Sequence, residues 1–180
     1  MSSDATSSSD AAATPDDLTA ASRRLLEEVF NTGNVALADE LIAANAVNHD
    51  PSLPEKLRAL RGPEALKQTV TMYRSAFPDV QMTVDDAVRE DDTVVLRWHA
   101  QGTHRGELAG LAPTAARVTV TGISIDQWKD GKIVEAWVEW DNLGLARQIG
   151  AAPPEGSIPE KIGTSVQRVM ARRMRGKAHS

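Results

Sequence analysis

The segment at residues 135–142, Glu-Ala-Trp-Val-Glu-Trp-Asp-Asn, reads as a strand that carries both tryptophans and carboxylates. Strand alternation places Glu135, Trp137, Glu139 and Asp141 on one face. A carboxylate that lies beside an indole and away from water has a raised pKa, which suits proton transfer near neutral pH. Asp141 is therefore a candidate general acid–base residue. The structural alternative is that Asp141 caps the turn or helix that follows the strand.

Two histidines stand near the ends of expected elements. His49 precedes an Asp-Pro pair, which forces an extended or turn backbone, and His104 lies in the glycine-bounded segment Gly102–Glu107. Each is a candidate hydrogen-bond partner or proton shuttle in a pocket, although a single histidine is more often a structural residue. The small apolar residues at 108–114 suit a flap over a pocket mouth, or an ordinary strand connection.

A third group of candidates lies in the expected strand at 94–101. Arg97 and His99 share one face of this strand, and Trp98 lies on the other. An arginine in the middle of a strand usually pairs with a carboxylate, and Glu135 or Glu139 would be natural cross-strand partners.

Other kinds of chemistry lack their motifs. The chain has no cysteine, which excludes disulfides, zinc-thiolate sites and thiol nucleophiles. It contains no HxH or HExxH metal motif, no glycine-rich nucleotide-binding loop and no GxSxG elbow. The expected chemistry is acid–base work by carboxylate and imidazole groups, with no metal and no cofactor.

Composition indicates one globular domain. The chain has 180 residues, of which 41% are hydrophobic and 25% are charged. The net charge of −5 argues against nucleic acid as the main partner. No apolar run reaches the roughly 18 residues of a membrane span, and the first residues lack the pattern of a secretion signal, so we expect no membrane partner and a cytoplasmic location.

The order of elements predicts an α+β fold. Apolar residues recur at helical spacing in three segments, at 18–30, 35–42 and 62–77, and the last of these buries Tyr73. After Pro78 the period changes to two, and the expected strands lie at 80–84, 94–101, 117–128 and 132–140. Such strands form a meandering antiparallel sheet, and a curved sheet wrapped around the N-terminal helices encloses a cone-shaped pocket.

The two ends differ from the domain at 17–150. Residues 1–16 are Ser, Ala, Asp and Thr without aliphatic periodicity, which predicts a disordered leader. Residues 151–180 form a basic extension, in which six Lys or Arg oppose one Glu from 158 onward. That segment carries +5, so the preceding 157 residues carry −10. It is either a solvated tail or a short amphipathic helix that docks on the domain or a partner.

The order of motifs resembles the SnoaL-like polyketide cyclases, also called ester cyclases, over residues 18–150. The motifs that carry the resemblance are Arg97-Trp98, Gly102–Glu107, Gly110–Thr114, Thr121-Gly122, Asp130–Glu135, Trp137 with Asp141, and Gln148 with Gly150.

This resemblance implies the cone fold shared with ketosteroid isomerase and scytalone dehydratase, and a homodimer or homotetramer. It implies an enzyme of secondary metabolism, such as antibiotic biosynthesis, that closes a polyketide ring by aldol addition. By its position in Trp-x-x-x-Asp, Asp141 would be the acid–base residue, and His49 and His104 would assist it. The residues expected to contact the substrate are Arg97, Trp98, His99, Tyr73, Gln127, Trp137 and Glu139.

Two other functions fit the same fold. An epoxide hydrolase, hydratase or isomerase would use Asp141 with Glu139 or Arg97 to activate water or move a proton. A non-catalytic protein would use the pocket to bind a small molecule, and its basic tail would recruit a partner.

Overall fold

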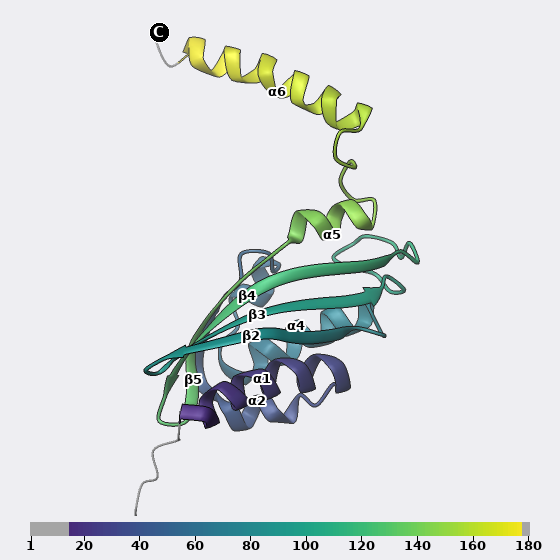
Figure 1. Ribbon diagram of the computed structural model, residues 1–180. Coiled ribbons are helices and arrows are strands. Elements are labelled where there is room, and N and C mark those ends of the chain that lie inside the picture. Colours follow the sequence, from purple (N-terminus) through teal and green to yellow (C-terminus); the bar gives the residue numbers. More distant parts are fainter. Residues whose placement is uncertain (1–14, 178–180) are drawn as a thin grey trace, which may run out of the picture.

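The computed structural model describes residues 15–177, in which helices cover one face of a curved five-stranded sheet (Figure 1). The α+β prediction is confirmed. The elements are α1 (Pro15–Thr32), α2 (Ala36–Leu41), β1 (Ile42–His49), α3 (Glu55–Arg58), α4 (Gly62–Ala76), β2 (Gln81–Glu90), β3 (Thr93–Thr103), β4 (Arg117–Lys129), β5 (Lys132–Trp140), α5 (Asn142–Gln148) and α6 (Ile158–Lys177).

The first helix, α1, is amphipathic, as the spacing of its apolar residues predicts. Leu18, Leu25 and Val29 are buried in the core, which α1 shares with the inner face of the sheet. The helix ends where Gly33 adopts a φ of +78° and donates its N–H to the Val29 carbonyl at 3.2 Å. This left-handed cap favours glycine, so the Asn-Thr-Gly-Asn sequence at 31–34 ends the helix.

The sheet has the strand order β1-β5-β4-β3-β2. The last four strands form the expected antiparallel meander, and the hairpin between β4 and β5 turns at Asp130 (φ 50°) and Gly131 (φ 71°). The first strand, β1, was not predicted, and it pairs in parallel with β5. Its sequence, IAANAVNH, is rich in Ala and Asn, which are poor strand formers, so pairing with β5 overrides the local preference.

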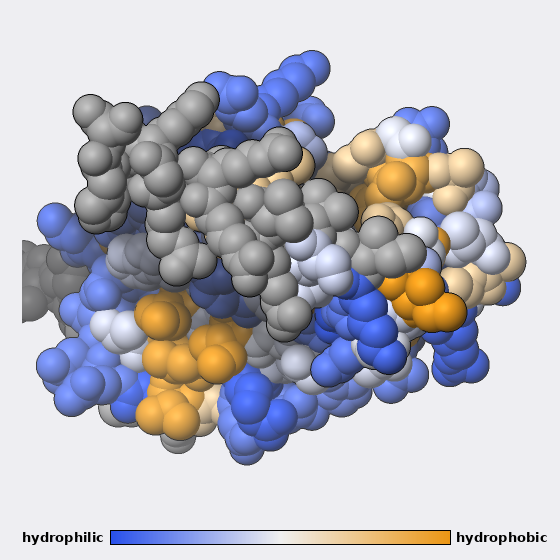
Figure 2. Space-filling view, turned by 90° about the horizontal axis from the view of Figure 1, so that it is seen from above, coloured by the Kyte–Doolittle hydropathy of each residue, from blue (hydrophilic) through white to orange (hydrophobic). Residues whose placement is uncertain are grey.

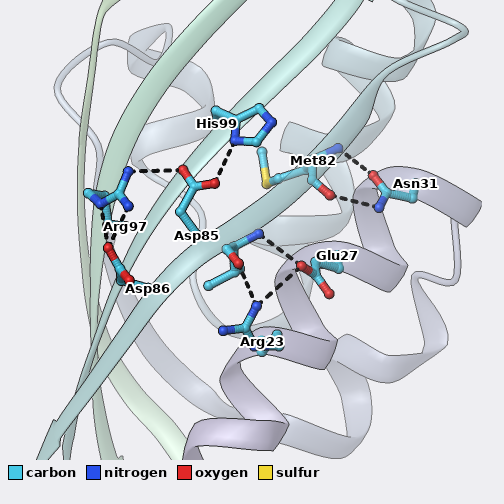
Figure 3. A network of polar contacts seen from close by, with 9 residues as sticks. Arg23, Glu27, Asn31, Met82, Asp85, Asp86, Arg97 and His99 are labelled. Carbon is cyan, nitrogen blue, oxygen red and sulfur yellow. Dashed lines mark hydrogen bonds and ion pairs between the residues drawn. The ribbon is translucent and has the colours of Figure 1, made fainter.

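The edge strand β2 is covered by side chains from α1 (Figure 3). Asn31 donates to the Met82 carbonyl at 2.9 Å and accepts from the Met82 N–H at 2.6 Å. One turn earlier in α1, Glu27 accepts the Val84 N–H at 2.8 Å, and two turns earlier Arg23 donates to the Val84 carbonyl. These side chains satisfy backbone groups that another strand would otherwise pair, and they fix α1 against the sheet.

A β-bulge in β5 decides which residues face the core. Ile133 pairs with Trp128, whereas Glu135 pairs with Gln127, so Val134 is an additional residue. Ile133 is buried, and strict alternation from it would turn residues 135, 137, 139 and 141 inward. The bulge reverses that phase. After it, the side chains that face the helices are those of Ala136, Val138 and Trp140.

Beyond α5, the chain continues into α6, which extends away from the domain in Figure 1. Arg147 of α5 pairs with Glu160 of α6 at 2.7 Å. The basic extension thus contains a helix, and the expectation that it docks on a partner stays a prediction. Seen from above relative to Figure 1, the surface that is not grey is largely hydrophilic, with separate hydrophobic patches (Figure 2).

Within residues 15–177, no helix combines the length and hydrophobicity that a bilayer span requires. Most of the proposed leader, residues 1–14, lies outside the described part of the chain.

Candidate active site

An apolar cavity lies between the concave face of the sheet and helices α1 and α4. Its volume is about 180 Å³, and it is not fully enclosed. A cavity of this size is larger than a packing defect and can hold an aromatic ring. Its wall is mainly aliphatic and aromatic, and includes Leu66, Tyr73, Trp98, Val138 and Trp140. The domain therefore carries a pocket suited to a hydrophobic small molecule.

Three tryptophans on the inner face are held by serines. Each donates its indole N–H to a serine hydroxyl, which fixes the ring and satisfies a buried donor. The pairs are Trp98 with Ser124 (2.9 Å), Trp128 with Ser22 (3.0 Å) and Trp140 with Ser52 (2.8 Å).

Asp126 is a buried carboxyl group on the cavity wall. It projects inward from β4 and is 8% exposed, and its cross-strand neighbours are Val94 and Ala136. Burial raises the pKa of Asp126 to about 6, and a hydrogen bond from Ser22 opposes that rise. A carboxyl group with this pKa exchanges protons readily near neutral pH.

A second polar cluster surrounds Asp50. Its Oδ1 accepts hydrogen bonds from Ser52 N at 2.9 Å and from Ser52 Oγ at 2.5 Å. Burial, and then the charge of Asp50, raise the pKa of Tyr73 to about 12, while a hydrogen bond with Ser52 opposes the rise. Tyr73 is therefore a neutral phenol at physiological pH and can donate a hydrogen bond to an oxyanion.

The two clusters lie at different positions along the cavity. Trp140, which contacts Ser52, pairs with Gly122 of β4, and Asp126 lies four residues further along that strand. Four residues of strand correspond to about 13 Å. The two clusters can therefore contact different parts of one bound molecule.

The described part of the cavity wall carries no positive charge. Among the described residues that line it, none is Lys, Arg or His. Nor do three His, Asp or Glu side chains of the described residues lie together in a way that could hold a metal ion. The polar groups in the wall are instead hydroxyl, amide, phenol and carboxyl groups.

The prediction that Trp137 and Asp141 face the pocket is wrong. Trp137 is 38% exposed and neither residue lines the cavity, because the bulge at Val134 turns this face outward. Asp141 is exposed and caps α5, since its Oδ1 accepts the Gly144 N–H at 2.7 Å. The structural alternative for Asp141 is the one that the geometry supports.

His49 also lies on the outer face. Its ring stacks on Trp137 with 5.2 Å between the ring centres, and its Nε2 lies 2.7 Å from Glu135. Glu139 lies on the same exposed face of β5. These residues form an exposed cluster rather than part of a pocket wall.

Arg97 and His99 share the outer face of β3, as predicted, but their partners are not those expected. Arg97 pairs with Asp85 and Asp86, and His99 contacts Asp85 at 2.9 Å (Figure 3). A bulge in β2 presents the two consecutive aspartates to the same guanidinium. The predicted pairing of Arg97 with Glu135 or Glu139 is wrong, because β2 supplies closer carboxylates.

His104 and Gln127 are also separate from the cavity wall. His104 is fully buried beside Phe77, with its Nδ1 3.2 Å from the Thr114 hydroxyl. Its backbone N–H and carbonyl pair with the far end of its loop, so it anchors this connection. Gln127 accepts a hydrogen bond from Thr93 at 2.9 Å on the outer face.

Of the predicted site residues, Tyr73 and Trp98 line the cavity. Sequence reasoning missed Asp50 and Asp126. Asp126 shares strand parity with Val118 and Val120, both of which contribute to the wall, and this parity was the available signal.

Comparison with known proteins places residues 20–149 in a family model described as SnoaL-like polyketide cyclase. The aklanonic acid methyl ester cyclase DnrD of Streptomyces peucetius is 32% identical over 139 residues, which cover 76% of this chain and 94% of DnrD. The cyclase DauD of Streptomyces sp. (strain C5), which has the same substrate in its name, is also 32% identical, with 76% and 85% coverage.

Solved structures agree with these relatives. Wild-type IdmH from Streptomyces antibioticus is 33% identical, with a TM-score of 0.62 and coverage of 77% of this chain and 99% of IdmH. TsrD from Streptomyces laurentii is 28% identical, with a TM-score of 0.64 and coverage of 74% and 97%. The chain thus belongs to the SnoaL-like polyketide cyclase family.

Proposed function

We propose that this protein is a cofactor-independent cyclase that closes a ring in a neutral polyketide ester by intramolecular aldol addition. The observation that carries the proposal is a buried carboxyl group on the wall of an apolar cavity, in a chain of this family. The acid–base role that the sequence assigned to a carboxylate is retained, but its location moves from the outer face of β5 to the cavity.

In the proposed reaction, a carboxylate removes a proton from a carbon between two carbonyl groups, and the C–H electron pair forms an enolate. The enolate carbon adds to a carbonyl carbon of the same molecule, which makes a C–C bond and leaves an alkoxide. The alkoxide takes a proton from the carboxylic acid, so no atoms are lost. Tyr73, a neutral phenol in the Asp50 cluster, can donate a hydrogen bond to a carbonyl oxygen in another part of the substrate.

Confinement of the substrate in the cavity also lowers the barrier to ring closure. A flexible chain has to bring two of its own carbons together, and an apolar cavity that holds it folded removes much of that entropic cost. The rings of Trp98 and Trp140 lie in the wall and are fixed by their serine partners. They present rigid surfaces against which a planar substrate can stack.

The charges of the cavity favour an esterified substrate. A free carboxylate would enter a wall that holds Asp50 and Asp126 but no cationic side chain among the described residues. A buried charge without a partner costs several kcal/mol. The names of the curated relatives specify a methyl ester. We infer the same kind of substrate here.

Hydration or epoxide opening by Asp141 with Glu139 or Arg97 lacks support in this arrangement. All three side chains lie outside the cavity. A purely ligand-binding role would not require a buried carboxyl group on the wall of an apolar cavity.

The direct test is incubation of the protein with aklanonic acid methyl ester and, separately, with the free acid. We expect a product of unchanged mass and altered retention from the ester, with kcat/KM at least about 100-fold higher than for the acid. A mass gain of one water would indicate a hydratase instead. An ester that binds and is recovered unchanged would indicate a binding protein.

We also propose that two copies associate through the outer face of the sheet, as the resemblance implies. No helix of the described residues covers this face, and it exposes Ile123 (46%) and Trp137 (38%). A tetramer built from such dimers is the larger alternative, and the expected location remains the cytoplasm.

A further inference from the structure

The packing of strand β4 does not explain why position 126 is an aspartate. Its side chain points from the middle of β4 into the cavity, between Val94 on one side and Ala136 on the other. Aspartate and glutamate are among the residue types that are least often buried without an oppositely charged partner. Such a costly placement, on the wall of a ligand cavity, is typical of a functional group.

The other carboxylates near the site have structural roles. Asp50 closes a local turn by accepting the Ser52 N–H, and Asp141 caps α5 by accepting the Gly144 N–H. The hydrogen bond to Asp126 comes instead from a side chain, that of Ser22.

Ser22 and Trp128 fix the orientation of this carboxyl group. The indole N–H of Trp128 only donates, so the Ser22 oxygen accepts it at 3.0 Å. The Ser22 hydroxyl hydrogen is then directed to Asp126. The Ser22 side chain of α1 thus fixes this carboxyl group on the wall of the cavity.

We propose that Asp126 is the catalytic residue that exchanges protons with the substrate, and that Ser22 and Trp128 are its positioning residues. This inference rests on the proposed cyclase function and assigns the group that performs it. As a carboxylate, Asp126 accepts the proton of the C–H bond when the enolate forms. As a carboxylic acid, it returns that proton to the alkoxide after the C–C bond has formed, and so regains its initial state.

The decisive comparison is between Asp126→Asn and Asp141→Asn. Asparagine at 126 keeps the size and hydrogen-bonding capacity but has no exchangeable acid proton, so we expect kcat for the methyl ester to fall at least about 100-fold. Asparagine at 141 preserves the helix cap, so kcat should stay within about twofold of wild type.

The pH dependence supplies a readout that a structural role would not change. The groups that face Asp126 are Ser22 from α1, Val94 from β3 and Ala136 from β5, and none of them titrates. Because the base must be ionised, kcat/KM of the wild type should fall as the pH drops below about 6, the pKa to which burial raises Asp126. Ser22→Ala removes the hydrogen bond that lowers this pKa, so its acid limb should move to higher pH.

Folding of the variant is checked by its melting temperature. The pKa of folded Asp126 lies above the unfolded value of 3.8, so ionisation destabilises the wild type as the pH rises through 4 to 6. Asp126→Asn lacks that penalty and should melt at or above the wild-type temperature at pH 8.

The outcomes separate the inference from the function on which it rests. If the wild type turns over the ester and only Asp126→Asn loses that activity, the result supports both the cyclase function and the role of Asp126. Equal turnover by wild type and a folded Asp126→Asn overturns the role of Asp126 and leaves the cyclase function standing. Loss in Asp141→Asn with full activity in Asp126→Asn also overturns it. No turnover by the wild type counts against the proposed function itself.

Discussion

Replacing Val138 by phenylalanine is expected to lower kcat/KM for the methyl ester at least about 100-fold while the protein remains folded. Val138 lies in the cavity wall, opposite Ser124 on the neighbouring strand. A larger ring at this position occupies the space in which the substrate must fold, and a displacement of about 1 Å from the reactive geometry can cost this much. Because the ring enters a hollow instead of a packed core, the melting temperature should be unchanged or higher.

The matched control is Glu139→Phe, one residue further along β5. Glu139 is exposed on the outer face, so the same added bulk never meets the cavity. We expect its kcat/KM to stay within about twofold of wild type. If both substitutions reduced turnover equally, the cavity would have no special part in the reaction.

The second large effect is on stability, at Gly122. A Cβ added there would lie 2.3 Å from Trp98 Cζ2 and 2.8 Å from Trp140 Cβ. Trp98 is buried and tied to Ser124, so it has little freedom to move. We expect Gly122→Ala to lower the free energy of unfolding by about 2 kcal/mol, as overpacking does. The melting temperature should fall by about 6 °C.

Gly163→Ala is the control for that substitution. Gly163 lies within α6, and an added Cβ would meet no atom within 4 Å. Alanine is the better helix former, so the melting temperature should not fall. If Gly122→Ala melted like wild type in calorimetry, the close packing of Trp98 and Trp140 over this glycine would be wrong.

Helices α1, α2 and α4 and four of the strands follow from the sequence because their periodicity is strong and their ends carry turn signals. The stripe of α1, the proline at the start of α4 and the Asp130-Gly131 hairpin each specify a local structure. β1 could not be predicted in this way. Its Ala-rich and Asn-rich sequence favours no strand, and only the parallel pairing with β5 defines it.

The candidate site was harder to predict, because one additional residue in β5 reverses which face of that strand lies inside. Alternation alone groups Trp137 with Asp141, but it does not say which face is inside. Ile133 is buried, and Val134 is then absorbed in a bulge that no sequence pattern marks. The family resemblance led to the correct class of protein, whereas the residues it indicated on β5 lie on the outer face.

The burial of Asp126 was equally hard to predict from the sequence. Its strand parity with Val118 and Val120 places it on their face, but parity alone does not say that this face is buried. Its burial depends on the register of β4 between β3 and β5, and on Ser22, which is 104 positions earlier in the chain. Tertiary pairing creates the unusual pKa, so sequence periodicity alone cannot reveal it.

The most direct test of the central claim, that the substrate binds inside the cavity and not on the outer face, is tryptophan fluorescence during mixing with aklanonic acid methyl ester. Trp140 lines the cavity and Trp137 is exposed outside it. The account predicts that Trp137→Phe keeps the ligand-induced quenching in full, whereas Trp140→Phe loses a large part of it. Quenching that disappears with Trp137→Phe and persists with Trp140→Phe would contradict the account.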